Sequence, residues 1–122
     1  METMGSRSAT ELLQLPVQLH GIRLGRPVDL LLDPVEWRAL GFVVLCGDET
    51  SRFLVFAAAD LRAEAIDLPS ALVLLEDVEF YRERSRSLRA LLGDELRDLL
   101  VDSDGSVRPV GPSVESERVS TA

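Results

Sequence analysis

The chain has no lysine and no asparagine, and it has only one cysteine, Cys46, and one histidine, His20. A single cysteine excludes a disulfide within the chain, which is typical of proteins of a reducing compartment. Zinc sites usually take several Cys and His ligands, so these two residues do not complete one. Cys46 ends an apolar run and is expected to be a small buried hydrophobe. His20 has no nucleophile motif near it, so we expect a histidine in a turn or on a strand face.

Long hydrophobic runs are also missing from the sequence. The longest ones, at residues 40–46, 53–59 and 71–75, are far shorter than the roughly 20 residues that a membrane-spanning helix needs. The first ten residues lack the apolar stretch of a secretory signal. We therefore expect no membrane insertion and a cytoplasmic location.

Positive charge is scarce compared with negative charge. Acidic residues outnumber basic ones by 21 to 13, and the formal net charge is −8. This balance opposes binding to phosphate backbones, so no nucleic-acid partner is expected. Arginines gather only at residues 82–89, where glutamates lie among them. This segment is interpreted as a solvated face laced with salt bridges.

Motifs for metal binding, nucleotide binding and catalysis are incomplete. Residues 102–105 (Asp-Ser-Asp-Gly) begin like a calcium loop, but Val107 and Ser113 stand where an EF-hand needs glycine and glutamate. We therefore predict a turn there. Residues 21–25 lack the third glycine and the following helix of a dinucleotide fingerprint. The carboxylates at residues 76–79 and 94–95 are interpreted as solvated. No catalytic, cofactor-binding or metal-ligating residue is predicted, and we do not expect an enzyme.

Short apolar segments separated by turn residues predict a mainly β fold. Their spacing of about a dozen residues favours an antiparallel meander that closes into a small barrel. Val28, Leu30 and Leu32 are expected on one strand face. Both faces of the central strands are apolar, so one face must be covered by the segment after Asp77, by the terminal regions or by a second subunit. The strand candidates are residues 17–24, 28–33, 40–46, 52–57, 63–68 and 71–75.

The region after Asp77 allows two interpretations. Leucines at positions 88, 91, 92, 96, 99 and 100 predict a helix within residues 82–92 that could run on to Leu100, although Gly93 weakens it. Residues 92–102 also echo residues 24–33, since each segment begins Leu-Gly, contains Asp-Leu-Leu and ends in an acidic residue. The echo would continue into a hairpin turn. The sequence leaves open whether residues 88–108 form a helix or a truncated second barrel repeat.

Composition divides the chain into three parts. Residues 1–15 are predicted to be a flexible leader, in which a short helical turn could precede Pro16. Residues 16–102 are predicted to be the folded domain, with a helical segment at its carboxyl end. Residues 103–122 are rich in Ser, Val, Gly, Pro and Glu, and we expect a disordered tail.

The segment from Gly21 to Arg82 resembles the PRC-barrel family. The similarity is carried by residues 25–33, 40–44, 52–56 and 65–77. The resemblance implies a six-stranded β-barrel that acts as a docking or regulatory module and has no catalytic centre of its own. Family members include a ribosome maturation factor and the H subunit of the photosynthetic reaction centre. The RNA-processing-type domain of the first and the membrane helix of the second are missing, so no site residue transfers.

The leading functional hypothesis is a non-catalytic protein-interaction or adaptor module without a cofactor. Its partner would be another protein, and self-association through the apolar outer face of the central strands is one form of it. The first alternative is a sensor for a small ligand or ion at the barrel mouth, with Asp48, Glu49 and Arg52 as candidate contacts. The second alternative, ribosome-assembly assistance, rests on fold-level analogy alone.

Overall fold

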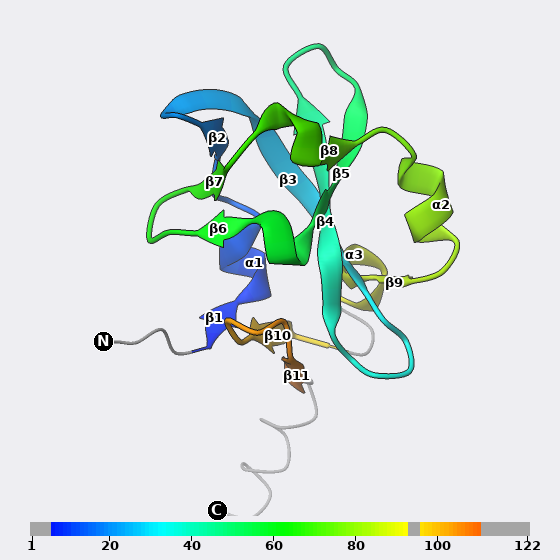
Figure 1. The fold of residues 1–122 in the computed structure, drawn as a ribbon. Coiled ribbons are helices and arrows are strands. Elements are labelled where there is room, and N and C mark those ends of the chain that lie inside the picture. Colours follow the sequence, from blue (N-terminus) through cyan, green and yellow to red (C-terminus); the bar gives the residue numbers. More distant parts are fainter. Residues whose placement is uncertain (1–5, 93–95, 111–122) are drawn as a thin grey trace, which may run out of the picture.

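The structure is a computed structural model that describes residues 6–92 and 96–110 (Figure 1). It is mainly β, with 49% of the residues in strands and 19% in helices, which confirms the predicted class. The elements in chain order are β1 (Arg7–Ser8), α1 (Ala9–Leu12), β2 (Val17–Leu19), β3 (Ile22–Leu32), β4 (Ala39–Cys46), β5 (Ser51–Val55), η1 (Phe56–Ala58), β6 (Asp60–Leu61), β7 (Ile66–Leu68), η2 (Ala71–Val73), β8 (Leu74–Leu75), α2 (Val78–Arg82), β9 (Arg86–Ser87), α3 (Leu88–Leu91), β10 (Asp98–Val101) and β11 (Val107–Val110).

Eight strands form one sheet that curls into a half-barrel, and three form a second, smaller sheet. The large sheet runs β6-β7-β2-β3-β4-β5-β8, with β9 paired to β3, and the small one runs β1-β10-β11. This count differs from the expected six strands because several two-residue strands extend the sheet edges. The expected antiparallel meander holds for β2 to β5, whereas β7 pairs with β2 in parallel.

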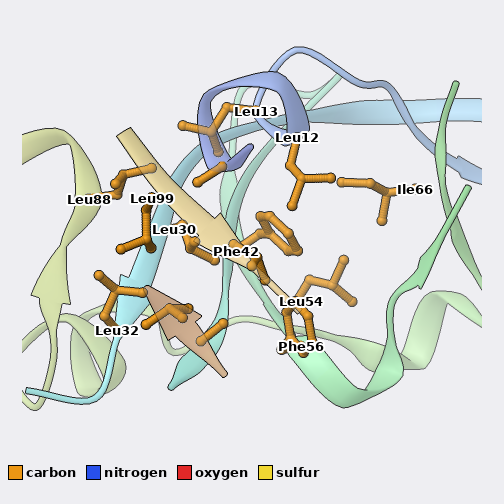
Figure 2. Close-up of a cluster of buried hydrophobic side chains, with 14 of the residues drawn as sticks. Leu12, Leu13, Leu30, Leu32, Phe42, Leu54, Phe56, Ile66, Leu88 and Leu99 are labelled. Carbon is orange, nitrogen blue, oxygen red and sulfur yellow. The ribbon is translucent and has the colours of Figure 1, made fainter. Parts of the chain in front are cut away.

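The inner face of the half-barrel holds the main hydrophobic core (Figure 2). Phe42 and Leu54 from neighbouring strands are fully buried there, together with Leu12 of α1, Leu88 of α3 and Leu99 of β10. Alternation along β3 places Leu30 and Leu32 in this core and Leu31 on the other face. A β-bulge between Pro27 and Asp29 breaks the alternation, so the prediction that Val28 shares a face with Leu30 is wrong.

Helix α2 covers the outer face of the central strands (Figure 1). Its residues Val78 and Tyr81 pack against Leu31, Val43 and Phe53. The Tyr81 and Phe53 rings stack with 4.0 Å between their centroids. The segment after Asp77 is therefore the cover that the doubly apolar strands require.

Two corresponding serine–aspartate clasps each tie a strand to the short strand and helix beside it, one in the large sheet and one in the small sheet. Asp29 of β3 accepts hydrogen bonds from the Ser87 hydroxyl and from the backbone N–H groups of Leu30 and Arg89. Asp98 of β10 accepts the same kinds of hydrogen bond from the Ser8 hydroxyl and from the N–H groups of Leu99 and Thr10. Ser87 and Ser8 also cap α3 and α1 in the same way.

The turns that follow β3 and β10 complete this correspondence. The Ala39 N–H donates to the Gly105 carbonyl at 2.7 Å, and the Val107 N–H donates to the Trp37 carbonyl at 3.2 Å. Trp37 and Gly105 both have positive φ angles, of 53° and 94°. The described parts of the two echo segments thus lie in corresponding hairpins, β3–β4 and β10–β11, which make matching contacts.

Several expected boundaries need correction. The flexible leader expected at residues 1–15 differs from the structure, which pairs Arg7 with β10 and buries Ala9 and Leu12 in the core. Within residues 82–92, where the sequence predicts a helix, α3 and the last residue of α2 are helical. This helix does not extend to Leu100, because residues 98–101 form β10. The strand expected at residues 71–75 is mostly the turn η2, since the Ser70 hydroxyl accepts a hydrogen bond from the Leu72 N–H.

The prediction that a disordered tail begins at residue 103 is wrong for residues 103–110, which are part of the fold. Residues 103–105 form the turn predicted from the Asp-Ser-Asp-Gly run, and β11 follows it and pairs with β10. Residues 111–122, which make up the rest of that expected tail, lie outside the described residues, as do Gly93, Asp94 and Glu95.

Candidate functional site

Two surface hollows lie at one end of the half-barrel, which we call the hairpin end, and a third extends from its β2–β3 turn along β6 and β7. The hairpin end comprises the β2–β3 turn at residues 20–21, the β4–β5 turn at residues 47–50, and η2 (Figure 1). The arginine hollow has a volume of about 300 Å3 and is lined by Arg23, Leu24, Gly25, Arg26, Leu45, Cys46 and Gly47. The loop hollow has about 390 Å3 and is lined by Leu24, Cys46, Gly47, Asp48, Arg52, Ala71 and Leu74.

Local backbone chemistry shapes this end. His20 and Gly21 both have positive φ angles, of 53° and 79°, and they join β2 to β3 in the two-residue turn that suits a twisted hairpin. A Cβ atom at Gly25 would lie 2.9 Å from Cys46 Cα, so a residue without a side chain lets β3 and β4 approach closely. Gly25 and Cys46 both line the arginine hollow at this close approach. The third hollow, of about 390 Å3, includes His20, Asp60, Arg62 and Asp67 in its lining.

The structure brings together two of the three candidate ligand contacts. Arg52 and Asp48 both line the loop hollow and form an ion pair at 3.8 Å, and Arg52 forms a second ion pair with Glu76 at 3.3 Å. Asp48 also accepts hydrogen bonds from the Thr50 hydroxyl and N–H, and these bonds are the main reason why the pKa of Asp48 lies below its ordinary value. Glu49 lies at the tip of the turn and lines none of the three hollows described.

Cys46 lines both the arginine hollow and the loop hollow and is half-buried. Cys46 is therefore less buried than the sequence predicts. Desolvation raises the pKa of its thiol, which keeps the thiol protonated near neutral pH. His20 lies in the β2–β3 turn, as predicted, and lines a different hollow.

Two exposed apolar residues are the sequence neighbours of residues that line the hollows. Ile22, next to Arg23, is 67% exposed, and Leu72, next to Ala71, is 87% exposed. This placement of Leu72 has no sequence signal, because the apolar run at residues 71–75 predicts a strand instead. Among the described large hydrophobic residues, the only others so exposed are Val35, in the β3–β4 turn at the opposite end, and Phe80, on α2.

Arg23 and Arg26 differ from the other described arginines. Neither has a hydrogen bond, ion pair or ring contact to another residue in the part of the chain that the structure describes. Both are exposed and line the arginine hollow. The sequence directed attention instead to residues 82–89, where Arg82 pairs with Glu79 and Arg84 lies over the Phe80 ring.

No protein-family model and no curated protein matches this chain. The resemblance to PRC barrels therefore stays a prediction. Across residues 6–92 and 96–110, no group of three or more Cys, His, Asp or Glu residues is placed to hold a metal ion. Within the same ranges no helix has the length and apolar character needed to cross a bilayer.

Proposed function

We propose that the chain is a cytoplasmic, non-catalytic protein-interaction module of PRC-barrel type, and that it binds its partner through the hairpin end. The observation that carries this proposal is the exposure of Ile22 and Leu72 beside open hollows. Apolar side chains at the rim of a concave surface are typical of protein-binding sites, where they become buried against the partner.

The cover provided by α2 favours the hairpin end over the outer strand face. Self-association through that outer face would require displacement of Val78 and Tyr81 from Val43 and Phe53. If the partner is a second copy of the chain, it binds at the hairpin end as well. The protonated thiol of Cys46 and the placement of His20 in another hollow support a non-catalytic role, because a thiolate nucleophile needs a base beside it.

Capture of a partner from the lysate of the natural host tests this proposal. The tagged wild type is compared with Ile22→Ser/Leu72→Ser and with Val35→Ser, which removes a residue of similar exposure (84%) at the other end of the half-barrel. We expect a nuclease-resistant protein partner that the wild type and Val35→Ser retain and the double variant loses. A partner retained equally by all three proteins would contradict the proposed surface.

A small-ligand sensor is the second candidate function, and the loop hollow favours it. Asp48 and Arg52 face this hollow, which has a volume of about 390 Å3, within the range of ligand pockets. A ligand that binds only the folded state must raise the unfolding midpoint. A thermal-shift screen of metabolites and divalent ions should therefore find stabilisation that Arg52→Ala removes. A screen without any stabilising compound would argue against this function.

A further inference from the structure

Arginine pairing in this protein is almost complete, and its exceptions coincide in space. Twelve of the 13 arginines lie in the described residues, since Arg118 does not. Ten of the twelve have a partner within the protein: Arg7, Arg38, Arg52, Arg62, Arg82, Arg84, Arg86, Arg89, Arg97 and Arg108. Within the described part of the chain, only Arg23 and Arg26 are left without one, and both line the arginine hollow.

The charge balance makes this coincidence informative. The chain has 21 acidic residues, so carboxylates are abundant partners for arginine. The carboxylates around Arg52, which lines the loop hollow, are already engaged, because Asp48 contacts Thr50 and Arg52, and Glu76 pairs with Arg52. Arg23 and Arg26 thus present two unneutralised guanidinium groups locally, on a protein whose net charge would repel anions.

The hollow between these arginines is suited to an extended ligand. Leu24, Leu45 and Cys46 line it together with the two arginines, and Leu24, Cys46 and Gly47 also line the neighbouring loop hollow. Exposed Ile22 directly precedes Arg23, which lines the arginine hollow. Guanidinium groups pair well with carboxylates, and the apolar lining residues suit aliphatic or aromatic side chains.

We infer that the hairpin end recognises an acidic segment of a protein partner, in which carboxylate side chains pair with Arg23 and Arg26 and neighbouring apolar side chains contact the apolar lining of the hollow and Ile22. This inference rests on the proposed function and specifies the chemistry of the partner. An extended segment fits better than a lone small anion, because Leu24, Leu45 and Cys46 line the hollow beside the two arginines and offer apolar contacts that a small anion cannot use.

Selection from a randomised peptide library displayed on phage tests this inference. The baits are the intact wild type, Arg23→Glu/Arg26→Glu, and Arg82→Glu/Arg84→Glu, a control with the same change in net charge at the end of α2 and just after it. Circular dichroism first confirms that all three are folded. We expect peptides rich in Asp and Glu next to apolar residues, bound at least about tenfold more weakly by Arg23→Glu/Arg26→Glu than by the other two proteins. Raising the salt concentration should weaken wild-type binding.

The outcomes separate this inference from the proposed function. One outcome is a set of peptides without acidic enrichment that bind Arg23→Glu/Arg26→Glu as well as the wild type but do not bind Ile22→Ser/Leu72→Ser. This outcome would overturn the inference of an acidic partner and would still support the proposed interaction surface. Displacement of the selected peptides by millimolar inorganic phosphate, with phosphate alone raising the unfolding midpoint, would overturn it in favour of a small-anion site. A library that yields no binder to the wild type would contradict both.

Discussion

Close packing of the central strands depends on one residue. A Cβ atom at Gly41 of β4 would overlap the Leu54 carbonyl oxygen and lie 2.5 Å from Phe53 Cζ. We expect Gly41→Ala to lower the free energy of unfolding by about 1–3 kcal/mol, as is typical of overpacking. At Gly47 the nearest atom to an added Cβ is 3.9 Å away, so Gly47→Ala should change stability by less than about 0.5 kcal/mol. Equal losses in urea unfolding would contradict this account.

Acid should destabilise the protein through its hydrogen-bonded aspartates. Burial acts to raise the pKa of Asp98, but the hydrogen bonds from Ser8, Leu99 and Thr10 together outweigh it and hold that pKa below its ordinary value. The unfolded chain therefore takes up this proton first as the pH falls. The resulting stability is present above the unfolded pKa of about 3.9 and is lost as the pH drops through the lower folded pKa.

Urea unfolding between pH 7 and pH 2 checks this prediction. The difference in stability between the wild type and Asp98→Asn should be greatest at neutral pH and should shrink below about pH 4. The matched change at an exposed position, Glu64→Gln, should leave the acid dependence of the wild type nearly unchanged. A constant difference between wild type and Asp98→Asn across the whole range would contradict the role given to Asp98.

At the scale of elements, the two serine–aspartate clasps should differ in strength. Asp29 is 6% exposed, whereas Asp98 is half-buried. Ser87→Ala removes a hydroxyl from the more buried carboxylate and also the cap of α3, so we expect a loss of about 1–3 kcal/mol. Ser8→Ala should lower the free energy of unfolding by less than Ser87→Ala does. Ser51→Ala, at an exposed position of β5, should leave it almost unchanged. A larger loss for Ser8→Ala in chemical unfolding would contradict the proposed ranking.

Helix α2 should contribute stability through one of its two aromatic residues. Tyr81 stacks on the buried Phe53 ring, whereas Phe80 is 44% exposed. We expect Tyr81→Ala to lower the stability by about 2–3 kcal/mol and Phe80→Ala by less than about 1 kcal/mol. Thermal midpoints of the two variants measure the difference, and similar midpoints would argue against α2 as the cover of the sheet.

The sequence predicted the central elements well where the apolar pattern was strong. The runs at residues 28–33, 40–46 and 52–57 correspond to β3, β4 and β5. The region of Leu99 and Leu100 was ambiguous, because leucines at helical spacing also satisfy strand alternation over a few residues. There the Asp-Gly turn and pairing with β1 determine the structure, and Leu99 is buried while Leu100 is not fully so.

Other features depended on contacts between residues far apart in sequence. Ala9 and Leu12 are buried only because β10, some ninety residues later, pairs with the strand before them. The loop hollow was half predicted, since Asp48 and Arg52 line it and Glu49 does not. Arg23 and Arg26 could not be singled out from the sequence, because being unpaired is a property of the fold. In sequence they look like any other exposed arginines.

At the scale of the whole molecule, one end combines open hollows, exposed apolar residues and unpaired positive charge. The central claim is that this hairpin end is the surface that a partner protein covers. Hydrogen–deuterium exchange of the free protein and of the captured complex tests it most directly, because partner burial slows the exchange of backbone amides. The account predicts slower exchange in the complex at residues 20–26, 46–50 and 71–74, with no change on α2. Slower exchange confined to α2 or to β10 and β11 would contradict it.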